Sequence, residues 1–487
     1  MLFNSIDFAV FLPIVFLLYW FVTNRNLKLQ NILIVASSYV FYGWWDWKFL
    51  SLIIISTLID YTVGYFLGKE QIRKKRKTLL WISIISNLGI LGVFKYYNFF
   101  VSNFISAFSF FGTEINAGLL DIVLPVGISF YTFQTMSYTI DVYRRELEPT
   151  KDFIAFSAFV SFFPQLVAGP IERATHLLPQ FYIKRTFDYT KAVDGMRQIL
   201  WGLFKKIVIA DNCATYANLI FNNSSEYSGS TLVLGALFFA FQIYGDFSGY
   251  SDIAIGTSRL FGFDLMRNFN FPYFSRDIAE FWRRWHISLS TWFRDYVYIP
   301  LGGSRGSTWI KVRNIFIIFI LSGFWHGANW TFIAWGALNA LYFLPLLLTN
   351  KNRSHIETVA HGKYLPTLKE FSFMIITFSL TLLAWIFFRA ENIEHALSFI
   401  GGIFNGMFSK VSLYTSYRML VGKLGIPLLI IMILFIITEW IGRSGKYALE
   451  YTGLTWKRPY RYLLYYAIVA SLFWFGGEEQ QFIYFQF

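Results

Sequence analysis

A continuous apolar run at residues 315–348 limits the folds open to this sequence more than any other feature. The run is 34 residues long, and His326 is the one residue in it of the types His, Asp, Glu, Lys and Arg. A membrane-spanning helix needs only about 20 apolar residues, so the run is too long for a single crossing. Its middle reads SGFWHGANW at residues 322–330, where two glycines interrupt the helical pattern. We therefore predict two helices that meet at this break, and we name residues 315–348 the broken-helix region.

The composition extends this conclusion to the whole chain. Apolar residues make up 55% and charged residues 15% of the sequence, whereas a soluble domain has roughly 25% charged residues. We predict an all-α polytopic membrane protein, folded as a single membrane-embedded domain over residues 1–487. About ten to twelve transmembrane spans are expected, with re-entrant and interfacial helices in addition. The candidate spans are residues 8–22, 32–42, 49–67, 79–97, 153–167, 196–210, 231–244, 315–348, 371–388, 425–440 and 462–475.

The charge of the chain points to a membrane surface. The formal net charge is +13, and six of the nine residues at 69–77 are Lys or Arg, directly between two apolar segments. Cytoplasmic loops of membrane proteins carry such an excess beside anionic lipid, so we expect membrane lipid and not nucleic acid as the partner. The single cysteine, Cys213, excludes an intramolecular disulfide and a thiolate metal cluster, and we predict no metal site. The first apolar run follows a start without basic residues, which predicts a retained span and not a cleaved signal peptide.

Two stretches depart from the pattern of spans. Residues 124–173 are apolar but are broken by several prolines and glycines. Residues 267–313 hold eight Arg or Lys against three Asp or Glu, together with four tryptophans. This mixture is typical of amphipathic helices that lie in the membrane interface. We therefore place a region of about residues 260–313 mainly on the cytoplasmic side.

His326 is a candidate catalytic residue in the broken-helix region. It lies about ten residues, or ~16 Å, from one end of the apolar run. An ionisable side chain at membrane depth costs free energy unless it is paired or functional. A neutral imidazole, with an unperturbed pKa of ~6.5, can accept the proton of an attacking hydroxyl. The alternative is a structural histidine bonded to a backbone carbonyl near a helix end.

His286 is a second candidate, in the segment EFWRRWHISLS at residues 280–290. If this segment is one helix, Arg283 and His286 are three residues apart and share a face. The Arg283 guanidinium would then hold a phosphate or carboxylate beside the imidazole. The alternative, which the residues alone favour, is an interfacial amphipathic helix whose arginines extend to the membrane surface.

Three further polar residues, Gln242, Asp246 and Asp252, follow the apolar segment at 231–244. Buried carboxylates must be paired or hydrogen-bonded. These side chains therefore either position a catalytic group or a substrate, or hold neighbouring helices together. Asp60, inside another predicted span, is expected to be structural.

Several catalytic signatures are absent from the sequence. It has no Walker A loop, dinucleotide fingerprint, His-Glu-x-x-His motif, CxxC pair or Gly-x-Ser-x-Gly elbow. An ATP-driven pump, a Rossmann enzyme and a zinc protease are therefore disfavoured.

Six sequence blocks, in order along the chain, carry a family resemblance. They are MLFNSIDFAVFLPIVFLLYW at 1–20, FFPQLVAGPIER at 162–173, YGDFSGYSDIAIG at 244–256, FWRRWHISLSTWFRDYVYIPLGG at 281–303, SGFWHGANWTFIAWG at 322–336 and FIYFQF at 482–487. Together they resemble the membrane-bound O-acyltransferase family, in its bacterial branch of alginate O-acetyltransferases. A more distant resemblance is to the protein that exports D-alanine for teichoic-acid decoration.

The resemblance implies a ring of membrane helices around a funnel or tunnel in the bacterial inner membrane. It implies that His326 is the essential catalytic residue and that His286 is the second family histidine, on the cytoplasmic side. Acetyl-CoA is the expected donor, as a co-substrate and not as a permanently bound cofactor. The acetyl group is expected to reach an extracellular or envelope polysaccharide through a secreted or membrane-anchored partner of the SGNH-hydrolase type. The candidates for binding the donor or lining the tunnel are Arg283, Arg284, Gln242, Asp246, Asp252, Asn329 and Trp325.

Two alternatives stay open beside this interpretation. D-alanyl transfer to teichoic acid would use a carrier-protein thioester, and a carrier protein needs a matching docking surface that CoA does not. A transporter without chemistry of its own often shows inverted repeats, and no such symmetry is found in the sequence. The FIYFQF and RDYVYIPLGG blocks favour the acetylating branch.

Overall fold

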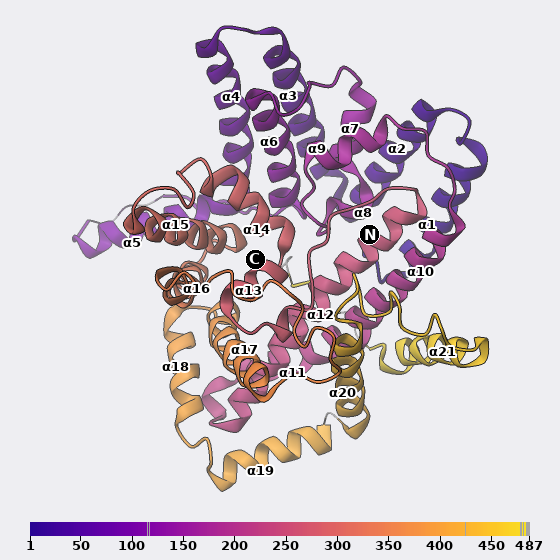
Figure 1. Cartoon of the computed structure of the whole chain (residues 1–487). Coiled ribbons are helices and arrows are strands. Elements are labelled where there is room, and N and C mark those ends of the chain that lie inside the picture. Colours follow the sequence, from indigo (N-terminus) through magenta and orange to yellow (C-terminus); the bar gives the residue numbers. More distant parts are fainter. Residues whose placement is uncertain (114, 116, 424, 478–479, 481, 484–487) are drawn as a thin grey trace. The chain divides into compact units, whose positions relative to one another are not determined.

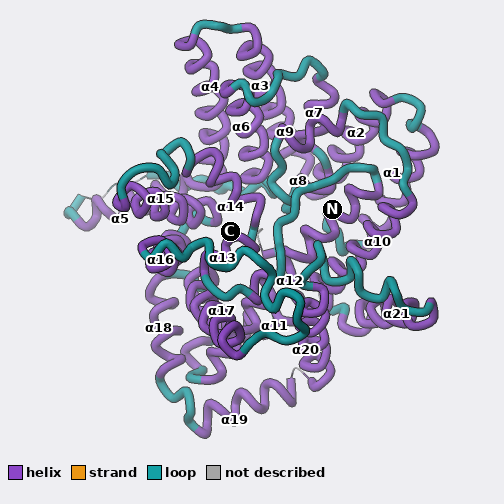
Figure 2. The backbone as a smooth tube through the Cα atoms, viewed as in Figure 1, coloured by secondary structure: helices purple, strands orange, loops and turns teal. Residues whose placement is uncertain are grey.

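The computed structural model describes residues 1–487 except 114, 116, 424, 478–479, 481 and 484–487 (Figure 1). Over this described part the chain consists of helices and loops without a β-strand (Figure 2), so the all-α prediction is confirmed. The chain forms two compact units. The first unit consists of Met1–Met196 and Ala254–Met266, and the second of Arg197–Ile253 and Arg267–Phe487. A single domain for the whole chain stays a prediction.

The first unit is built from helices of the N-terminal part of the chain. They are α1 (Ile6–Leu17), α2 (Leu27–Asp46), α3 (Leu50–Lys69), α4 (Arg73–Leu91), α5 (Tyr97–Phe110), α6 (Ile128–Arg144), α7 (Phe153–Ser161), α8 (Phe163–Leu166) and α9 (Ala174–Leu177). A π-helical turn, η1 (Leu18–Val22), continues α1. Two further helices, α10 (Tyr189–Leu203) and α12 (Ser230–Leu260), contribute residues to both units.

A buried carboxylate joins three helices of the first unit. Asp60 of α3 is fully buried. It accepts hydrogen bonds from Nδ2 of Asn87 at 2.8 Å and from Oγ1 of Thr139 at 3.0 Å, and Ser83 donates a further one. These donors belong to α4 and α6, so Asp60 links α3 to two other helices. Such contacts fit the structural role that was expected for Asp60.

The second unit contains the remaining helices. They are η5 (Phe204–Ala210), α11 (Asp211–Asn222), α13 (Ile278–Arg284), α14 (Ile287–Phe293), α15 (Thr308–His326), α16 (Trp330–Leu348), α17 (Leu368–Arg389), α18 (Ile393–Phe404), α19 (Lys410–Arg418), α20 (Gly425–Gly442) and α21 (Arg458–Phe475). In the region of about residues 260–313, α12 is followed by a 3-10 turn at Pro272–Phe274, the short helices α13 and α14, and a π-helical turn at Arg294–Tyr298 before α15 begins. Its placement at the cytoplasmic interface stays a prediction.

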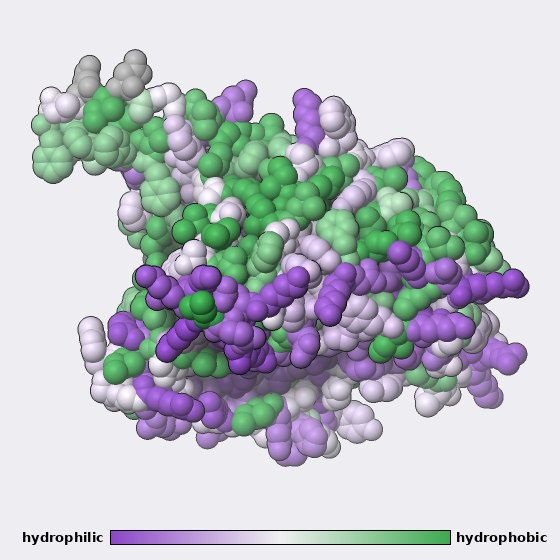
Figure 3. Space-filling model, turned by 90° about the horizontal axis from the view of Figure 1, so that it is seen from above, coloured by the Kyte–Doolittle hydropathy of each residue, from purple (hydrophilic) through white to green (hydrophobic). Residues whose placement is uncertain are grey.

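The number of membrane-capable helices is smaller than the sequence predicts. Within the described residues six helical segments are long and apolar enough to cross a membrane, or up to seven if a bent pair at Lys410–Gly442 is one span. The expected ten to twelve is higher because the predicted spans at 32–42 and 49–67 lie within one of these segments, Leu27–Lys69, and the predicted span at 153–167 contains only short helices, such as α7 with 9 residues. Hydrophobic residues nevertheless cover a large, continuous part of the face seen in Figure 3. The chain is a multi-pass membrane protein.

The broken-helix region forms a hairpin of α15 and α16, as predicted. His326 is the last residue of α15, and Asn329 caps α16 by accepting a hydrogen bond from the backbone N–H of Thr331 at 3.0 Å. The helices approach closely at two glycines. A Cβ atom at Gly323 would lie 2.1 Å from the carbonyl oxygen of Phe332, and one at Gly336 would lie 2.3 Å from a carbonyl oxygen of α15. The absence of side chains at these positions therefore sets the spacing of the hairpin.

We expect Gly336→Ala to destabilise the protein by roughly 1–3 kcal/mol, because its methyl group would overlap the backbone of α15. The measurement is thermal unfolding of the purified protein in detergent. Gly89→Ala on α4 is the matched control, since a Cβ there meets no atom within 4 Å. Its higher helix propensity should leave stability unchanged or raised. Equal melting temperatures for both variants would contradict the close approach.

Candidate active site

The second unit brings the two predicted histidines together. His326 ends α15, and His286 lies in the turn between α13 and α14. The centroids of their rings are 6.3 Å apart. The exposed fractions of His286 and His326 are 0% and 4%. The two imidazoles therefore belong to one buried site, although they come from separate sequence blocks.

Asn268 fixes the turn that carries His286. The φ angle of His286 is 44°, in the left-handed region that residues other than glycine seldom adopt. The carbonyl oxygen of Asn268 accepts a hydrogen bond from the backbone N–H of Ile287 at 2.9 Å, and its Oδ1 accepts one from Oγ of Ser288 at 2.5 Å. The amide of Asn268 in turn donates to Oγ of Ser251 on α12 at 3.1 Å. These contacts hold the backbone of the turn in place.

Aromatic rings surround the histidines. The centroid of the Trp325 ring is 5.8 Å from that of His286 and 4.9 Å from that of His326. Phe247 contacts His286 edge-to-face at 4.6 Å, and Trp335 contacts His326 in the same way at 5.2 Å. Such packing restricts the rotation of both imidazoles. Trp325, a predicted tunnel residue, therefore lies at the histidine pair.

Burial also determines the charge of His286. It lowers the pKa of His286 to about 3, because the imidazolium loses its hydration among apolar side chains. At physiological pH the imidazole is therefore neutral, the form that accepts a proton.

The two arginines predicted to bind the donor occupy different environments. Arg284 is buried and forms an ion pair with Glu280 at 2.9 Å. Arg283 is exposed and donates to two backbone carbonyls of the loop between α16 and α17, at 2.7 and 2.6 Å. Helix α13 ends at Arg284, and His286 precedes α14 in a left-handed conformation. The prediction that Arg283 and His286 share the face of one helix is therefore wrong.

Both predicted aspartates of α12 form buried ion pairs. Asp246 contacts Nζ of Lys206 at 2.7 Å. Asp252 contacts Nζ of Lys205 at 2.6 Å and accepts a hydrogen bond from Nε2 of Gln198 at 2.7 Å. These pairs connect α12 to α10 and η5, and they favour the role of holding helices together over that of binding a substrate.

Lys205 and Lys206 were not recognised as site residues from the sequence. They lie in the predicted span at 196–210, and the signal was present, because adjacent lysines in an apolar segment need acidic partners. Gln242, one turn of α12 before Asp246, is also buried, and its Oε1 has no hydrogen-bond partner in the described part of the chain.

The FIYFQF block reaches the same helix. Its residues 484–487 lie outside the described residues, whereas Phe482 and Ile483 are described. The backbone N–H of Ile483 donates to Oδ2 of Asp246 at 2.6 Å, and the Phe482 ring lies 5.0 Å from that of Tyr250. The predicted C-terminal block is therefore attached to α12 near its buried carboxylates.

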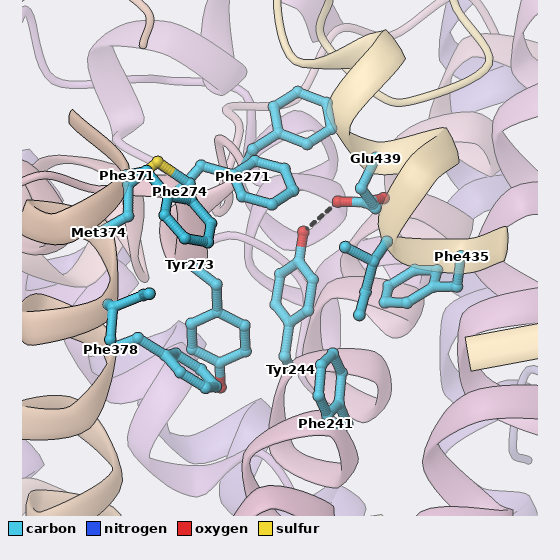
Figure 4. A pocket seen from close by; sticks show the side chains of 12 residues that line it. Phe241, Tyr244, Phe271, Tyr273, Phe274, Phe371, Met374, Phe378, Phe435 and Glu439 are labelled. Atoms are coloured by element: carbon cyan, nitrogen blue, oxygen red, sulfur yellow. Dashed lines mark hydrogen bonds between the residues drawn. The ribbon is translucent and has the colours of Figure 1, made fainter. Parts of the chain in front are cut away.

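An aromatic cavity of about 190 Å³ lies between α12, α17 and α20 (Figure 4). Glu439 is the acidic residue of its wall; it accepts hydrogen bonds from Tyr244 at 2.6 Å and from Nε1 of Trp201 at 3.0 Å. Tyr273, another wall residue, stacks at 5.9 Å on Trp285, which directly precedes His286 in the sequence. This cavity was not predicted from the sequence, although Glu439, an acidic residue within the predicted span at 425–440, was a signal for it.

Comparison with known proteins identifies the class to which this fold and site belong. A sequence profile described as MBOAT, the membrane-bound O-acyltransferase family, matches residues 39–388. The chain belongs to the membrane-bound O-acyltransferase family, as the resemblance indicated, and it is an O-acyltransferase.

Individual relatives carry more specific names. The chain is 42% identical to a probable alginate O-acetylase, AlgI, of Pseudomonas aeruginosa, over 81% of this chain and 73% of the relative. It is 34% identical to a peptidoglycan O-acetyltransferase of Helicobacter pylori, over 100% of this chain and 98% of the relative. A teichoic acid D-alanyltransferase of Bacillus subtilis is 28% identical, over 55% of this chain and 70% of the relative.

The buried pair of Lys205 and Asp252 leads to a stability prediction. Asp252→Asn leaves the ammonium of Lys205 buried without its counter-charge, and we expect a loss of about 3–5 kcal/mol in the free energy of unfolding. The double variant Lys205→Met/Asp252→Leu should recover part of this loss, because both charges of the pair are removed together. Unfolding in detergent is the measurement, with the exposed Lys446→Met as control. A double variant less stable than Asp252→Asn would argue against this account.

We expect the imidazole of His286 to stay neutral from about pH 5 to pH 8, because its pKa is lowered to about 3. The ¹⁵N chemical shifts of histidine-labelled protein report the charge, and His286→Asn assigns the signal. The unfolded chain binds this proton below pH ~6.5. The contribution of His286 to the free energy of unfolding is therefore complete above that pH. It is lost progressively as the pH falls toward 3, because protonation then favours the unfolded chain. An imidazolium signal from His286 at pH 6 would refute the prediction.

Proposed function

We propose that this O-acyltransferase moves acetyl groups from cytoplasmic acetyl-CoA across the bacterial inner membrane toward hydroxyl groups of an extracellular or envelope polysaccharide. The observation that carries the proposal is the buried pair of His286 and His326, 6.3 Å apart, in a chain of this family. The names of relatives at 42% and 34% identity, an alginate O-acetylase and a peptidoglycan O-acetyltransferase, support acetyl as the group and a polysaccharide as the final acceptor.

Acyl transfer from a thioester to a hydroxyl needs mainly correct positioning of the two substrates and a general base. A thioester is already activated, so transfer needs alignment of the acceptor, removal of its proton and stabilisation of the developing oxyanion. In the proposed reaction, the imidazole of His326 removes the proton from the acceptor hydroxyl. The oxygen of that hydroxyl forms a bond to the carbonyl carbon of the thioester. The carbon–sulfur bond then breaks, and the thiolate of CoA takes up the proton from the imidazolium. The products are an acetyl ester, free CoA thiol and neutral His326.

The other groups are assigned supporting roles. His286 lies close to His326 and is neutral, so it adds no positive charge to the buried site in which His326 takes up a proton. Arg283 is exposed, and its guanidinium is suited to the phosphates of CoA at the cytoplasmic side. A secreted or membrane-anchored partner of the SGNH-hydrolase type is proposed to deliver the acetyl group to the polymer.

D-alanyl transfer is a second candidate, and one observation favours it. A teichoic acid D-alanyltransferase is 28% identical over 55% of the chain, less similar and over a shorter part than the acetylating relatives. The same histidine chemistry serves either acyl group, because both donors are thioesters.

We expect His326→Ala to lower ester-linked acetyl on the host's secreted polysaccharide about 10²–10⁴-fold, the usual contribution of a general base. The host strain lacks its native copy, and variants are compared at equal membrane abundance. His361→Ala, in the exposed loop before α17, is the matched control and should acetylate normally. Unchanged acetylation in His326→Ala would exclude His326 as the base or acetyl as the transferred group. Analysis of ester-linked alanine then tests the second candidate.

A further inference from the structure

A second cavity, in the first unit, combines positive charge with aromatic walls. It has a volume of about 420 Å³ and is lined by residues of η1, of the turn that follows it, and of the segment before α10. We propose that this cavity binds one anionic phospholipid, with the phosphodiester of the headgroup at its cations and an acyl chain along its aromatic wall.

The cavity contains a buried cation that forms no ion pair within the described residues. Arg185 lines the cavity and is 7% exposed. Its guanidinium donates to neutral groups: Oδ1 of Asn31 at 2.7 Å, Oε1 of Gln30 at 3.4 Å and the carbonyl oxygen of Gln180 at 3.1 Å. It also lies over the rings of Phe263 and Tyr19, 4.8 and 5.7 Å from their centroids, and these contacts offset part of its charge without supplying an anion. Its Nε is buried and has no hydrogen-bond partner within the described residues. A buried charge that lacks a counter-charge is strongly unfavourable, so an anion in the cavity would stabilise Arg185.

A second argument is the charge of the cavity rim. Arg25 and Lys184 line the same cavity and are both exposed. None of the ion pairs found in the described part of the chain includes Arg25, Lys184 or Arg185, and no acidic residue lines the cavity. Three cations with no carboxylate among them favour an anionic ligand, and the flexible pair at the rim matches a headgroup phosphate.

The aromatic wall of the cavity favours a lipid over a soluble anion as the ligand. Phe187 packs edge-to-face against Phe16 at 5.9 Å and against Trp20 at 5.5 Å, and all three line the cavity. A phosphate ion or a sugar phosphate would leave this wall in contact with water, whereas an acyl chain would cover it.

The position in the chain supports the same ligand. The apolar helix Ile6–Val22 ends at this cavity, and the membrane-capable segment that starts at Leu27 follows after a short turn. The cavity therefore lies where apolar segments end, the level at which lipid headgroups and tryptophan rings are found. It belongs to the first unit, and the histidine pair belongs to the second, so this proposal does not depend on the proposed function.

The test is binding of defined lipids to the purified full-length protein in detergent, followed by native mass spectrometry. We expect phosphatidylglycerol to bind at least about tenfold more tightly than phosphatidylcholine. The double variant Arg25→Gln/Lys184→Gln should lose about thirtyfold in affinity, since each basic residue near a headgroup contributes ~1 kcal/mol. Lys351→Gln/Arg353→Gln, which removes the same charge from exposed residues of the loop between α16 and α17, is the matched control and should bind as the parent does.

Phe187→Gln tests the acyl-chain part of the site and should weaken phosphatidylglycerol severalfold while leaving the thermal stability of the protein unchanged. Glycerol 1-phosphate, the soluble probe, should not displace the lipid at equal concentration. Equal binding of the two phospholipids, equal loss in the two double variants, or full displacement by glycerol 1-phosphate would each overturn the proposal.

Discussion

The low dielectric of a helical interior inside a membrane is the constraint on which this structure depends. A polar group placed there must find a partner in the protein, because neither lipid nor water is available to replace one. Asp60 is satisfied by hydroxyl and amide donors of two other helices. Lys205 and Lys206 are satisfied by the carboxylates of α12. Hydrophobic burial alone does not select helix partners in lipid, so these polar contacts determine which helices pack together.

The same constraint shapes the proposed active site. Burial keeps His286 neutral and prevents a second positive charge beside His326, so a proton taken from an acceptor hydroxyl meets little repulsion. The α15–α16 hairpin contributes the other half of the geometry. Its helices touch at Gly323 and Gly336, and this close approach fixes the end of α15, where His326 lies. Stability of the hairpin and placement of the histidine therefore have one physical origin.

How much of the fold and of the site could be predicted from the sequence depends on whether each feature is set by neighbouring residues or by residues far away in the chain. The α15–α16 break was predictable because length and glycine spacing are local properties, and the two histidines were recognisable by their sequence blocks. The prediction that Arg283 and His286 share a helical face failed, because the left-handed turn at His286 is held by Asn268, which lies outside the local sequence pattern. The count of spans failed for a related reason. Hydropathy does not distinguish a short helix buried in protein, such as α7, from one that crosses a membrane.

Buried arginines show most clearly how the environment, and not the residue type, decides a role. Arg284 pairs with a carboxylate. Arg76 donates to backbone carbonyls of Leu67 and Val142, at the C-terminal ends of α3 and α6, where the helix dipole supplies negative potential. Within the described residues Arg185 forms no ion pair: it meets two side-chain amides, one carbonyl and the rings of Tyr19 and Phe263, and it lines a cavity with two further cations. What distinguishes Arg185 is that it lines a cavity beside two further cations, where a ligand of opposite charge can reach it, and at the end of an apolar helix the proposed ligand is a lipid headgroup.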